Sequence, residues 1–199
     1  MSDSSVDSGK RTWLIASGCA GAVGAGFTAV PFVSSFQPSE RARAAGAAVE
    51  VDVGALKPGE KLTVEWRGKP VWIVRRTPEQ LAELPKIDGL LADPKSQRKP
   101  DELTPEYARN EARSRKPELL VVVGICSHLG CSPTDKFQPG AQPSLPSDWV
   151  GGFLCPCHGS TFDMAGRVYK NKPAPDNLEV PPHMYLSDTR VLIGEDKKA

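Results

Sequence analysis

The chain has 199 residues, of which 39% are hydrophobic and 25% are charged, and its formal net charge is +1. This length is enough for one soluble domain plus an anchoring segment, and the near-neutral balance gives no indication of nucleic-acid binding. The 19 prolines and 18 glycines favour a loop-rich β protein over a helical one.

The N-terminal part of the chain contains a candidate membrane anchor. Residues 1–11 are polar and form a short tail that we expect on the cytoplasmic side. No residue from 12 to 39 is charged, and about 20 apolar residues suffice to span a bilayer. We therefore predict a single transmembrane helix over residues 12–38. Its many glycines and alanines indicate close packing against other membrane helices.

Charge alone does not orient this anchor, because Lys10 and Arg11 precede it while Arg41 and Arg43 follow it closely. The sequence K-R-T-W-L at positions 10–14 resembles a twin-arginine export signal with Lys in the first place. That resemblance implies that the anchor crosses the inner membrane of a bacterium and that the domain after it lies on the periplasmic side.

Residues 39–48 are short, charged and rich in alanine, so we interpret them as a flexible hinge. Two small-x-small sequences also lie there, at 42–44 and 45–47, so a cleaved signal peptide is an alternative to a retained anchor. Cys19, inside the uncharged run, has no evident partner and is interpreted as a small apolar residue. The remaining residues, 49–199, form the soluble head.

The head begins with three alternating segments that predict strands, the last two joined by a turn at Arg67-Gly68-Lys69: 49–53, 61–66 and 70–75. Two sequences have the form of a helix start, T-P-E-Q at 77–80 and T-P-E at 104–106. We expect the second helix to end near Lys116. The polar residues between the helices, 88–101, predict a surface loop, and we interpret the charges of this region as solvated.

The second half of the head consists of short strands and irregular loops. The continuous apolar run Leu119–Val123 predicts a buried strand, and three prolines make residues 136–149 an irregular excursion. His183 follows two prolines and is interpreted as a surface residue. Further short strands are predicted at 161–163, 167–169, 178–180, 184–187 and 190–193.

Two cysteine and histidine motifs carry the strongest chemical signal. C-S-H-L-G-C at 126–131 and C-P-C-H-G-S at 155–160 contain four of the 5 cysteines and two of the 3 histidines. A single turn in each motif would aim one Cys and one His at a common centre, and each motif has one cysteine more. Six such groups exceed a tetrahedral site, so the simplest division is four metal ligands plus one disulfide. A disulfide indicates an oxidising compartment.

These motifs resemble the cluster-binding loops of Rieske iron-sulfur proteins of the type found in bacterial cytochrome bc1 complexes. The resemblance extends over most of the chain and implies a mainly β, antiparallel Rieske head with a small cluster-binding subdomain at 124–176. It implies a disulfide between Cys131 and Cys157. It also implies a [2Fe-2S] cluster held by two thiolates and two imidazoles: Cys126, Cys155, His128 and His158.

The resemblance further implies a role in quinol oxidation. The head would accept an electron and a proton from quinol, expected to be ubiquinol, at cytochrome b and pass the electron to cytochrome c1 within a dimeric complex. His158 would accept a hydrogen bond and then a proton from the quinol, and Leu129 would form the docking tip.

Three more positions follow the family pattern around the cluster. The hydroxyl of Ser160 would bond a bridging sulfide, and Phe162 stands where high-potential relatives often have Tyr, whose hydroxyl bonds a cysteine sulfur. The sequence P-A-P beginning at Pro173 resembles the proline loop that covers the cluster. Lys172 stands where many members have Gly.

The mixed ligand set explains why such a centre accepts an electron readily. Two thiolates neutralise the two-iron, two-sulfide core when both histidines are neutral, whereas four thiolates leave it negative. Rieske centres accordingly have potentials of roughly −150 to +300 mV, against about −400 mV for plant-type ferredoxins.

Three other interpretations account for fewer of these features. A structural zinc module explains four ligands but neither Cys131 nor Cys157. A soluble Rieske ferredoxin lacks both the disulfide pair and the anchor. The Rieske small subunit of a periplasmic oxidase, such as arsenite oxidase, can share the export signal, but the hinge and anchor favour the bc1 type.

Overall fold

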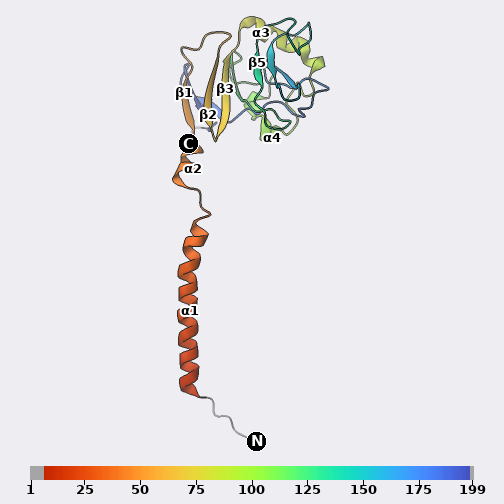
Figure 1. Ribbon diagram of the computed structural model, residues 1–199. Helices are drawn as coiled ribbons and strands as arrows, with labels where there is room; N and C mark the ends of the chain where they lie inside the picture. The colour runs from red at the N-terminus through yellow and green to blue at the C-terminus, as the bar shows by residue number, and fades with distance from the viewer. Residues whose placement is uncertain (1–6, 198–199) are drawn as a thin grey trace. The chain divides into compact units, whose positions relative to one another are not determined.

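The computed structural model describes residues 7–197, which divide into two compact units, one ending at Ala44 and a head beginning at Ala45. In the first unit, α1 (Ser8–Ser34) is one continuous helix (Figure 1), and none of its residues is buried. Its length and composition are sufficient to cross a membrane. The helix begins before the predicted span of 12–38 because the side chain of Asp7 caps it, accepting hydrogen bonds from two backbone N–H groups.

Residues 39–48, predicted as an irregular linker, contain a short helix, α2 (Glu40–Ala45). The Ser39 hydroxyl accepts a hydrogen bond from the Ala42 N–H, and Glu40 and Arg43 form an ion pair of 2.9 Å on its exposed side. The charges that indicated a solvated linker therefore also support one and a half turns of helix.

The head contains three antiparallel sheets of three strands each within the described residues. The first has the order β1-β9-β8, from β1 (Val49–Asp52), β8 (His183–Tyr185) and β9 (Arg190–Ile193). The second has the order β2-β3-β4, from β2 (Lys61–Trp66), β3 (Lys69–Arg75) and β4 (Leu119–Val123). The third has the order β5-β6-β7, from β5 (Thr134–Lys136), β6 (Gly152–Leu154) and β7 (Thr161–Asp163).

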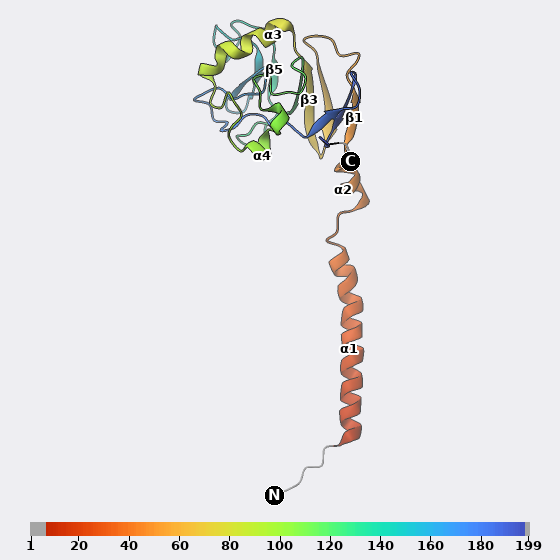
Figure 2. The same cartoon turned by 180° about the vertical axis from the view of Figure 1, so that it is seen from behind.

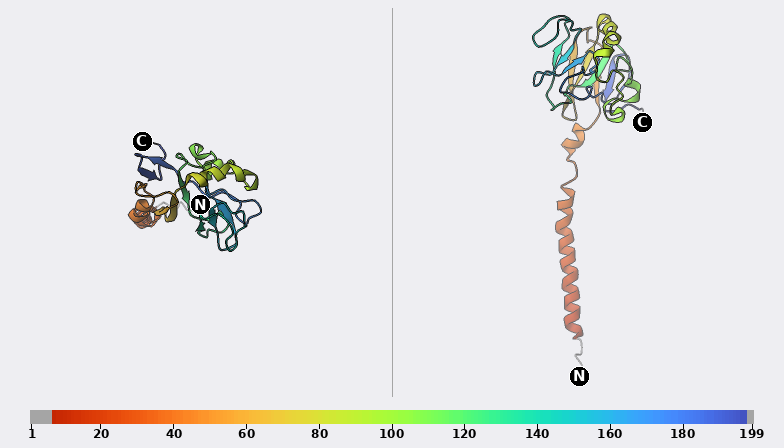
Figure 3. Two further views of the ribbon diagram at one scale, coloured as in Figure 1. Left: turned by 90° about the horizontal axis from the view of Figure 1, so that it is seen from above. Right: turned by 90° about the vertical axis from the view of Figure 1, so that its right-hand side faces the viewer.

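The sheets divide the head into two halves. Strands β1, β2 and β3 stand side by side in one half, whereas β5 and the helices α3 and α4 lie in the other (Figures 1 and 2). Seen from above, the blue C-terminal strands and the teal segment of β5 and β6 lie on opposite sides of the head (Figure 3).

In the sheet β2-β3-β4, β4 and the middle of β3 are buried on both faces, which explains their continuous apolar sequences, whereas β2 is partly exposed. Alternate residues of β3 and β4 enter different cores: Trp72, Val74, Leu120 and Val122 pack with the cysteine-histidine half. The residues between them pack with β1 and β9: Val71, Ile73, Leu119, Val121 and Val123. The sheet β2-β3-β4 therefore supports the β1-β9-β8 sheet on one face and the cysteine-histidine half on the other.

The first predicted helix start is correct. Helix α3 (Pro78–Glu83) begins with a complete capping box, in which Thr77 and Gln80 bond each other's backbone N–H groups, and it continues into the 3₁₀ helix η1 (Leu84–Leu90).

The second helix start was misread. Between 100 and 116 the structure has only α4 (Pro100–Leu103) and the 3₁₀ turn η2 (Glu106–Ala108). Most charged residues of this segment are exposed as predicted, but Arg113 is fully buried and its side chain bonds four separate backbone and hydroxyl groups. A regular helix would expose part of this segment to solvent, whereas the irregular backbone lets Arg113 reach the interior.

Several strand predictions are confirmed, and others differ in detail. Strands at 49–52, 61–66, 69–75, 119–123, 161–163 and 190–193 agree closely with the sequence. Strands β5 and β6 were missed because β5, T-D-K, has no apolar residue and β6, G-F-L, begins with glycine, so neither has the composition of a strand. Val168 and Tyr169 make only isolated bridges, and Leu178–Val180 belongs to no sheet.

The loop 88–101 is only partly a surface loop. Leu91, Asp93 and Ser96 are buried, and the two carboxylate oxygens of Asp93 accept hydrogen bonds from the N–H groups of Gln97 and Arg98. Hydrogen bonds between the backbone of this loop and the side chain of Asp93 therefore stabilise its conformation.

His183, expected at the surface, is fully buried. Its Nδ1 lies 2.9 Å from the Pro181 carbonyl oxygen, its backbone N–H donates to the Tyr107 hydroxyl, and its Nε2 has no protein partner. Burial lowers the pKa of His183 to about 4, so the ring is neutral at physiological pH.

This buried ring makes stability depend on pH. An unfolded histidine takes up a proton near pH 6.5, and buried His183 does not until about pH 4. The free energy of unfolding should therefore fall as pH drops from about 6.5 toward 4, by about 3 kcal/mol in total. In His183→Asn, which keeps a donor for Pro181, thermal unfolding of the full chain in detergent should lose this dependence. Parallel pH profiles for the two proteins would contradict the assignment.

Candidate metal centre

The two cysteine-histidine loops are built on the same backbone scaffold. In each, the N–H of the first cysteine donates to the carbonyl five residues later, and the N–H four residues later donates back to that cysteine's carbonyl. These bonds measure 2.8 to 3.1 Å and join Cys126 with Cys131 and Gly130, and Cys155 with Ser160 and Gly159. The two loops are therefore structural counterparts, although their histidines occupy different positions.

A glycine in each loop allows this closure. Gly130 has φ of 80° and Gly159 has φ of 75°, a left-handed conformation that other residues adopt only with strain. The second-to-last position of both motifs is Gly for this reason.

The first cysteines of the loops turn inward. Cys126 and Cys155 are each 2% exposed and carry free thiols. Burial raises the pKa of the Cys126 thiol, because a thiolate there would lack solvation. Two buried thiols in one apolar cluster therefore suit a metal centre, whose positive charge would replace the missing solvation.

The histidines lie at the outer end of the site. The ring centroids of His128 and His158 are 4.7 Å apart with the planes at 84°, and His128 is half-buried while His158 is exposed. Leu129, next to His128, is 72% exposed, the highest value among the large apolar residues of the described head. Two inner sulfurs and two outer imidazoles provide the donor set that a Rieske [2Fe-2S] cluster requires.

A disulfide between Cys131 and Cys157 joins the loops, as the resemblance implied. The sulfurs of Cys131, Cys155 and Cys157 lie within 4.8 Å of one another, but two of them are bonded together and so offer no thiolate. Cys155 is therefore the one cysteine of this group able to bind a metal.

A third segment is held against both loops by serine hydroxyls. The Ala174 N–H donates to Ser160 Oγ over 2.9 Å, and Ser127 Oγ donates to the Asp176 carbonyl over 2.7 Å. Pro173 is exposed and Ala174 is buried, so the P-A-P sequence forms an outer cover. The sequence analysis missed Ser127; its signal was a small hydroxyl residue directly after the first cysteine.

Phe162 and Ser160 are both fully buried. Phe162 lies on β7 opposite Phe153 of β6 and belongs to the same apolar cluster as Cys126 and Cys155. The residues singled out from the sequence therefore converge, from separate loops and strands, on one region of the head.

Comparison with known families agrees with this site. Residues 103–182 match the family model described as the Rieske [2Fe-2S] domain. Residues 7–39 match the model described as "Ubiquitinol-cytochrome C reductase Fe-S subunit TAT signal". The fold and the site thus define a Rieske iron-sulfur protein with an N-terminal export signal.

Comparison with individual similar proteins specifies the family within the Rieske proteins. The chain is 57% identical over 189 residues to the ubiquinol-cytochrome c reductase iron-sulfur subunit of Allochromatium vinosum, covering 94% of this chain and 89% of that protein. It is 40% identical over 189 residues to the subunit of the same name from Rhodospirillum rubrum, covering 94% and 93%. The chain belongs to the family of ubiquinol-cytochrome c reductase iron-sulfur subunits.

A solved structure titled "Hyperthermophilic respiratory Complex III" contains a chain 26% identical to this one, with a TM-score of 0.45. The match covers 89% of this chain and 97% of that chain. The expected cofactor of the family is the Rieske [2Fe-2S] cluster, and the zinc alternative is set aside.

The loop glycines provide a test with a matched control. Gly159 and Gly68 both have positive φ, 75° and 70°, and neither has an atom within 4 Å of where a Cβ would stand. Alanine at either position should therefore cost about 1 kcal/mol of stability through backbone strain alone. Only Gly159→Ala should also lower the iron content per chain, because it alone distorts a cysteine-histidine loop. Equal iron content in the two purified variants would contradict this role of the loop.

Proposed function

We propose that this chain accepts an electron and a proton from quinol in a cytochrome bc1 complex and passes the electron to cytochrome c1. The observation that carries the proposal is the pair of half-buried His128 and exposed His158, which lies at the outer end of a site with two buried thiols and an exposed leucine. Membership in the family of ubiquinol-cytochrome c reductase iron-sulfur subunits supports the same activity.

In this proposal the four cluster ligands form two pairs, one buried and one nearer the surface. Cys126 and Cys155 would hold the inner iron as thiolates, and His128 and His158 would hold the outer iron through ring nitrogens. When bound, the [2Fe-2S] cluster supplies a one-electron acceptor of near-neutral charge. The Cys131 and Cys157 disulfide keeps the two loops at a fixed separation.

The exposed ring of His158 is the proton acceptor. A ring nitrogen of His158 accepts a hydrogen bond from the quinol hydroxyl and then takes its proton as one electron leaves the quinol. The exposed side chain of Leu129 and the outer proline Pro173 pack against cytochrome b and keep water from this contact. The solvent-facing ring of His158 thus couples the electron and proton transfers.

The N-terminal unit serves export and attachment. Helix α1 is a single-pass anchor in the bacterial inner membrane, with residues 1–11 on the cytoplasmic side and the head on the periplasmic side. Residues 39–48 are the hinge about which the head moves between cytochrome b and cytochrome c1 in a dimeric complex. A mature protein whose N-terminal sequence begins near Ala45 would contradict the retained anchor, and resistance of residues 39–48 to limited proteolysis would contradict the hinge.

Electron paramagnetic resonance of membranes tests the function directly. Membranes that contain the full chain should give a Rieske spectrum, and an inhibitor bound at the quinol site should shift it by changing the hydrogen bond to His158. His158→Ala should abolish the spectrum, whereas His183→Asn, which changes a histidine far from the loops in sequence, should retain it. A Rieske spectrum indifferent to every quinol-site inhibitor would defeat the proposed docking.

Two substitutions near the buried thiols should move the reduction potential in opposite directions. Ser160 is fully buried in the loop of Cys155, and by the family pattern its hydroxyl would donate to a cluster sulfide, which favours the reduced form. Ser160→Ala should lower the potential by about 60 mV if that bond is worth about tenfold in electron affinity. Phe162→Tyr should raise it by adding a second donor. Protein-film voltammetry measures both, with exposed Ser147→Ala as the control, and an unchanged potential in both variants would refute this tuning.

A further inference from the structure

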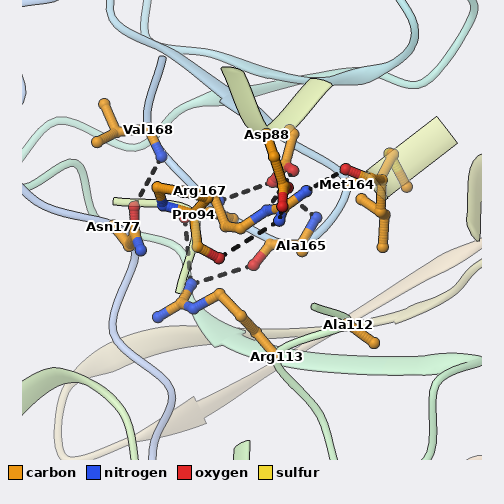
Figure 4. A network of polar contacts seen from close by, with 12 residues as sticks. Asp88, Pro94, Ala112, Arg113, Met164, Ala165, Arg167, Val168 and Asn177 are labelled. Atoms are coloured by element: carbon orange, nitrogen blue, oxygen red, sulfur yellow. Dashed lines mark hydrogen bonds and ion pairs between the residues drawn. The ribbon is translucent and has the colours of Figure 1, made fainter. Parts of the chain in front are cut away.

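Three arginines lie inside the head, where charged groups are rarely found. Arg76 is 2% exposed, and Arg113 and Arg167 are 0% exposed. Arg167 is conventionally paired: its Nε lies 2.7 Å from a buried Asp163 oxygen, and its Nη1 lies 2.7 Å from an oxygen of half-exposed Asp88 (Figure 4). The other two require a different explanation.

Arg76 and Arg113 have no carboxylate within ion-pair distance among residues 7–197. Arg76 donates to the carbonyl oxygens of Ala112, Pro117 and Met164 and to the Ser114 hydroxyl. Arg113 donates to the carbonyl oxygen of Ala165 (Figure 4), to those of Gly166 and Leu178, and to the Thr104 hydroxyl. Its Nε has no partner. Both charges are therefore held by neutral dipoles.

Both side chains remain charged at neutral pH. Burial lowers the pKa of Arg76 and of Arg113 to about 10, which still lies well above 7. A buried cation without an ion-pair partner is costly, and an apolar side chain of similar volume often serves stability equally well. A buried charge of this kind acts on its surroundings chiefly through its electric field.

The acidic residues around Arg76 and Arg113 do not neutralise the positive charge at the centre of this polar network. The four fully buried charged groups are three guanidinium groups and the carboxylate of Asp163, which is bound to Arg167. Asp88 lies further out, with 36% of its side chain exposed. Asp93 is satisfied by two backbone N–H groups. The innermost charge is therefore positive.

This charge lies close behind the cysteine-histidine loops. Arg76 and Arg113 bond the carbonyls of Met164, Ala165 and Gly166, which directly follow β7, and β7 directly follows the second loop. From Ser160 to Met164 an extended chain spans at most about 13 Å. Met164, Ala165 and Leu178 share one apolar cluster with Cys126 and Cys155, so little water screens the interval.

We propose that Arg76 and Arg113 raise the electron affinity of the bound cluster through the field of their unpaired charges, an inference that rests on the proposed function. Taking one electron makes the near-neutral cluster negative, and no covalent bond forms or breaks. Positive charge behind the loops favours that product over the oxidised form. For charges about 15 Å apart at an effective dielectric constant near 20, one guanidinium contributes roughly a sixfold change in electron affinity.

Two substitutions of Arg113, each made in the full chain in membranes, separate the effect of its charge from the effect of its packing. Redox titration followed by the Rieske paramagnetic signal should show about a sixfold loss of electron affinity in Arg113→Met. In Arg113→Lys, which keeps the charge and loses the forked contacts, the midpoint should stay near that of the unmodified chain although thermal unfolding begins earlier. Exposed Arg190→Met, on β9 of the β1-β9-β8 sheet, is the matched control and should leave the midpoint unchanged.

The outcomes are distinct. Equal midpoints for Arg113→Met and Arg113→Lys would overturn the inference and leave Arg113 a packing residue. If Arg113→Met does not accumulate, Asp88→Asn decides, because removing an opposing charge at the rim must raise electron affinity; an unchanged midpoint contradicts the proposal. Absence of any Rieske signal from the unmodified chain would instead contradict the proposed function.

Discussion

The head depends on holding two loops at a fixed separation although Cys131 and Cys157 are 26 residues apart in sequence. Three kinds of contact do this. The disulfide links the loops covalently, the shared backbone ring fixes each loop internally, and the hydroxyls of Ser127 and Ser160 bind the same third segment. Because each contact involves residues within or beside the motifs, the site is specified locally, and the rest of the head has to supply support and environment.

That support comes from a sheet with a core on each face. The strands β3 and β4 send alternate side chains into two cores, one shared with Cys126 and Cys155 and the other with β1 and β9. The same arrangement surrounds the buried thiols with apolar groups such as Phe153 and Phe162, so nearby charges act with little screening. Packing and electrostatics at the site therefore have a common origin.

Much of the fold and of the candidate site could be predicted from the sequence, and the predictions that failed have a common cause. The motifs, the hairpin of β2 and β3 and the capping box at Thr77 depend on neighbouring residues, and the structure contains each of them. The burial of Arg113 and His183 depends on backbone oxygens that are distant in sequence or set by an irregular chain path, such as those of Leu178 and Ala165. No local pattern distinguishes an arginine that will be enclosed by carbonyls from one that faces water.

The pairing of β1 with β9 has a mechanical consequence. The first strand of the head forms four residue pairs with the last, from Val49 with Ile193 to Asp52 with Arg190, at the edge of a sheet that contains none of the cysteine-histidine loops. A pull on the chain before Val49 is therefore borne by this ladder. Tension from a tethering segment would be absorbed before reaching β5, β6 or β7, so the head can be displaced as a rigid body with its cysteine-histidine loops undistorted.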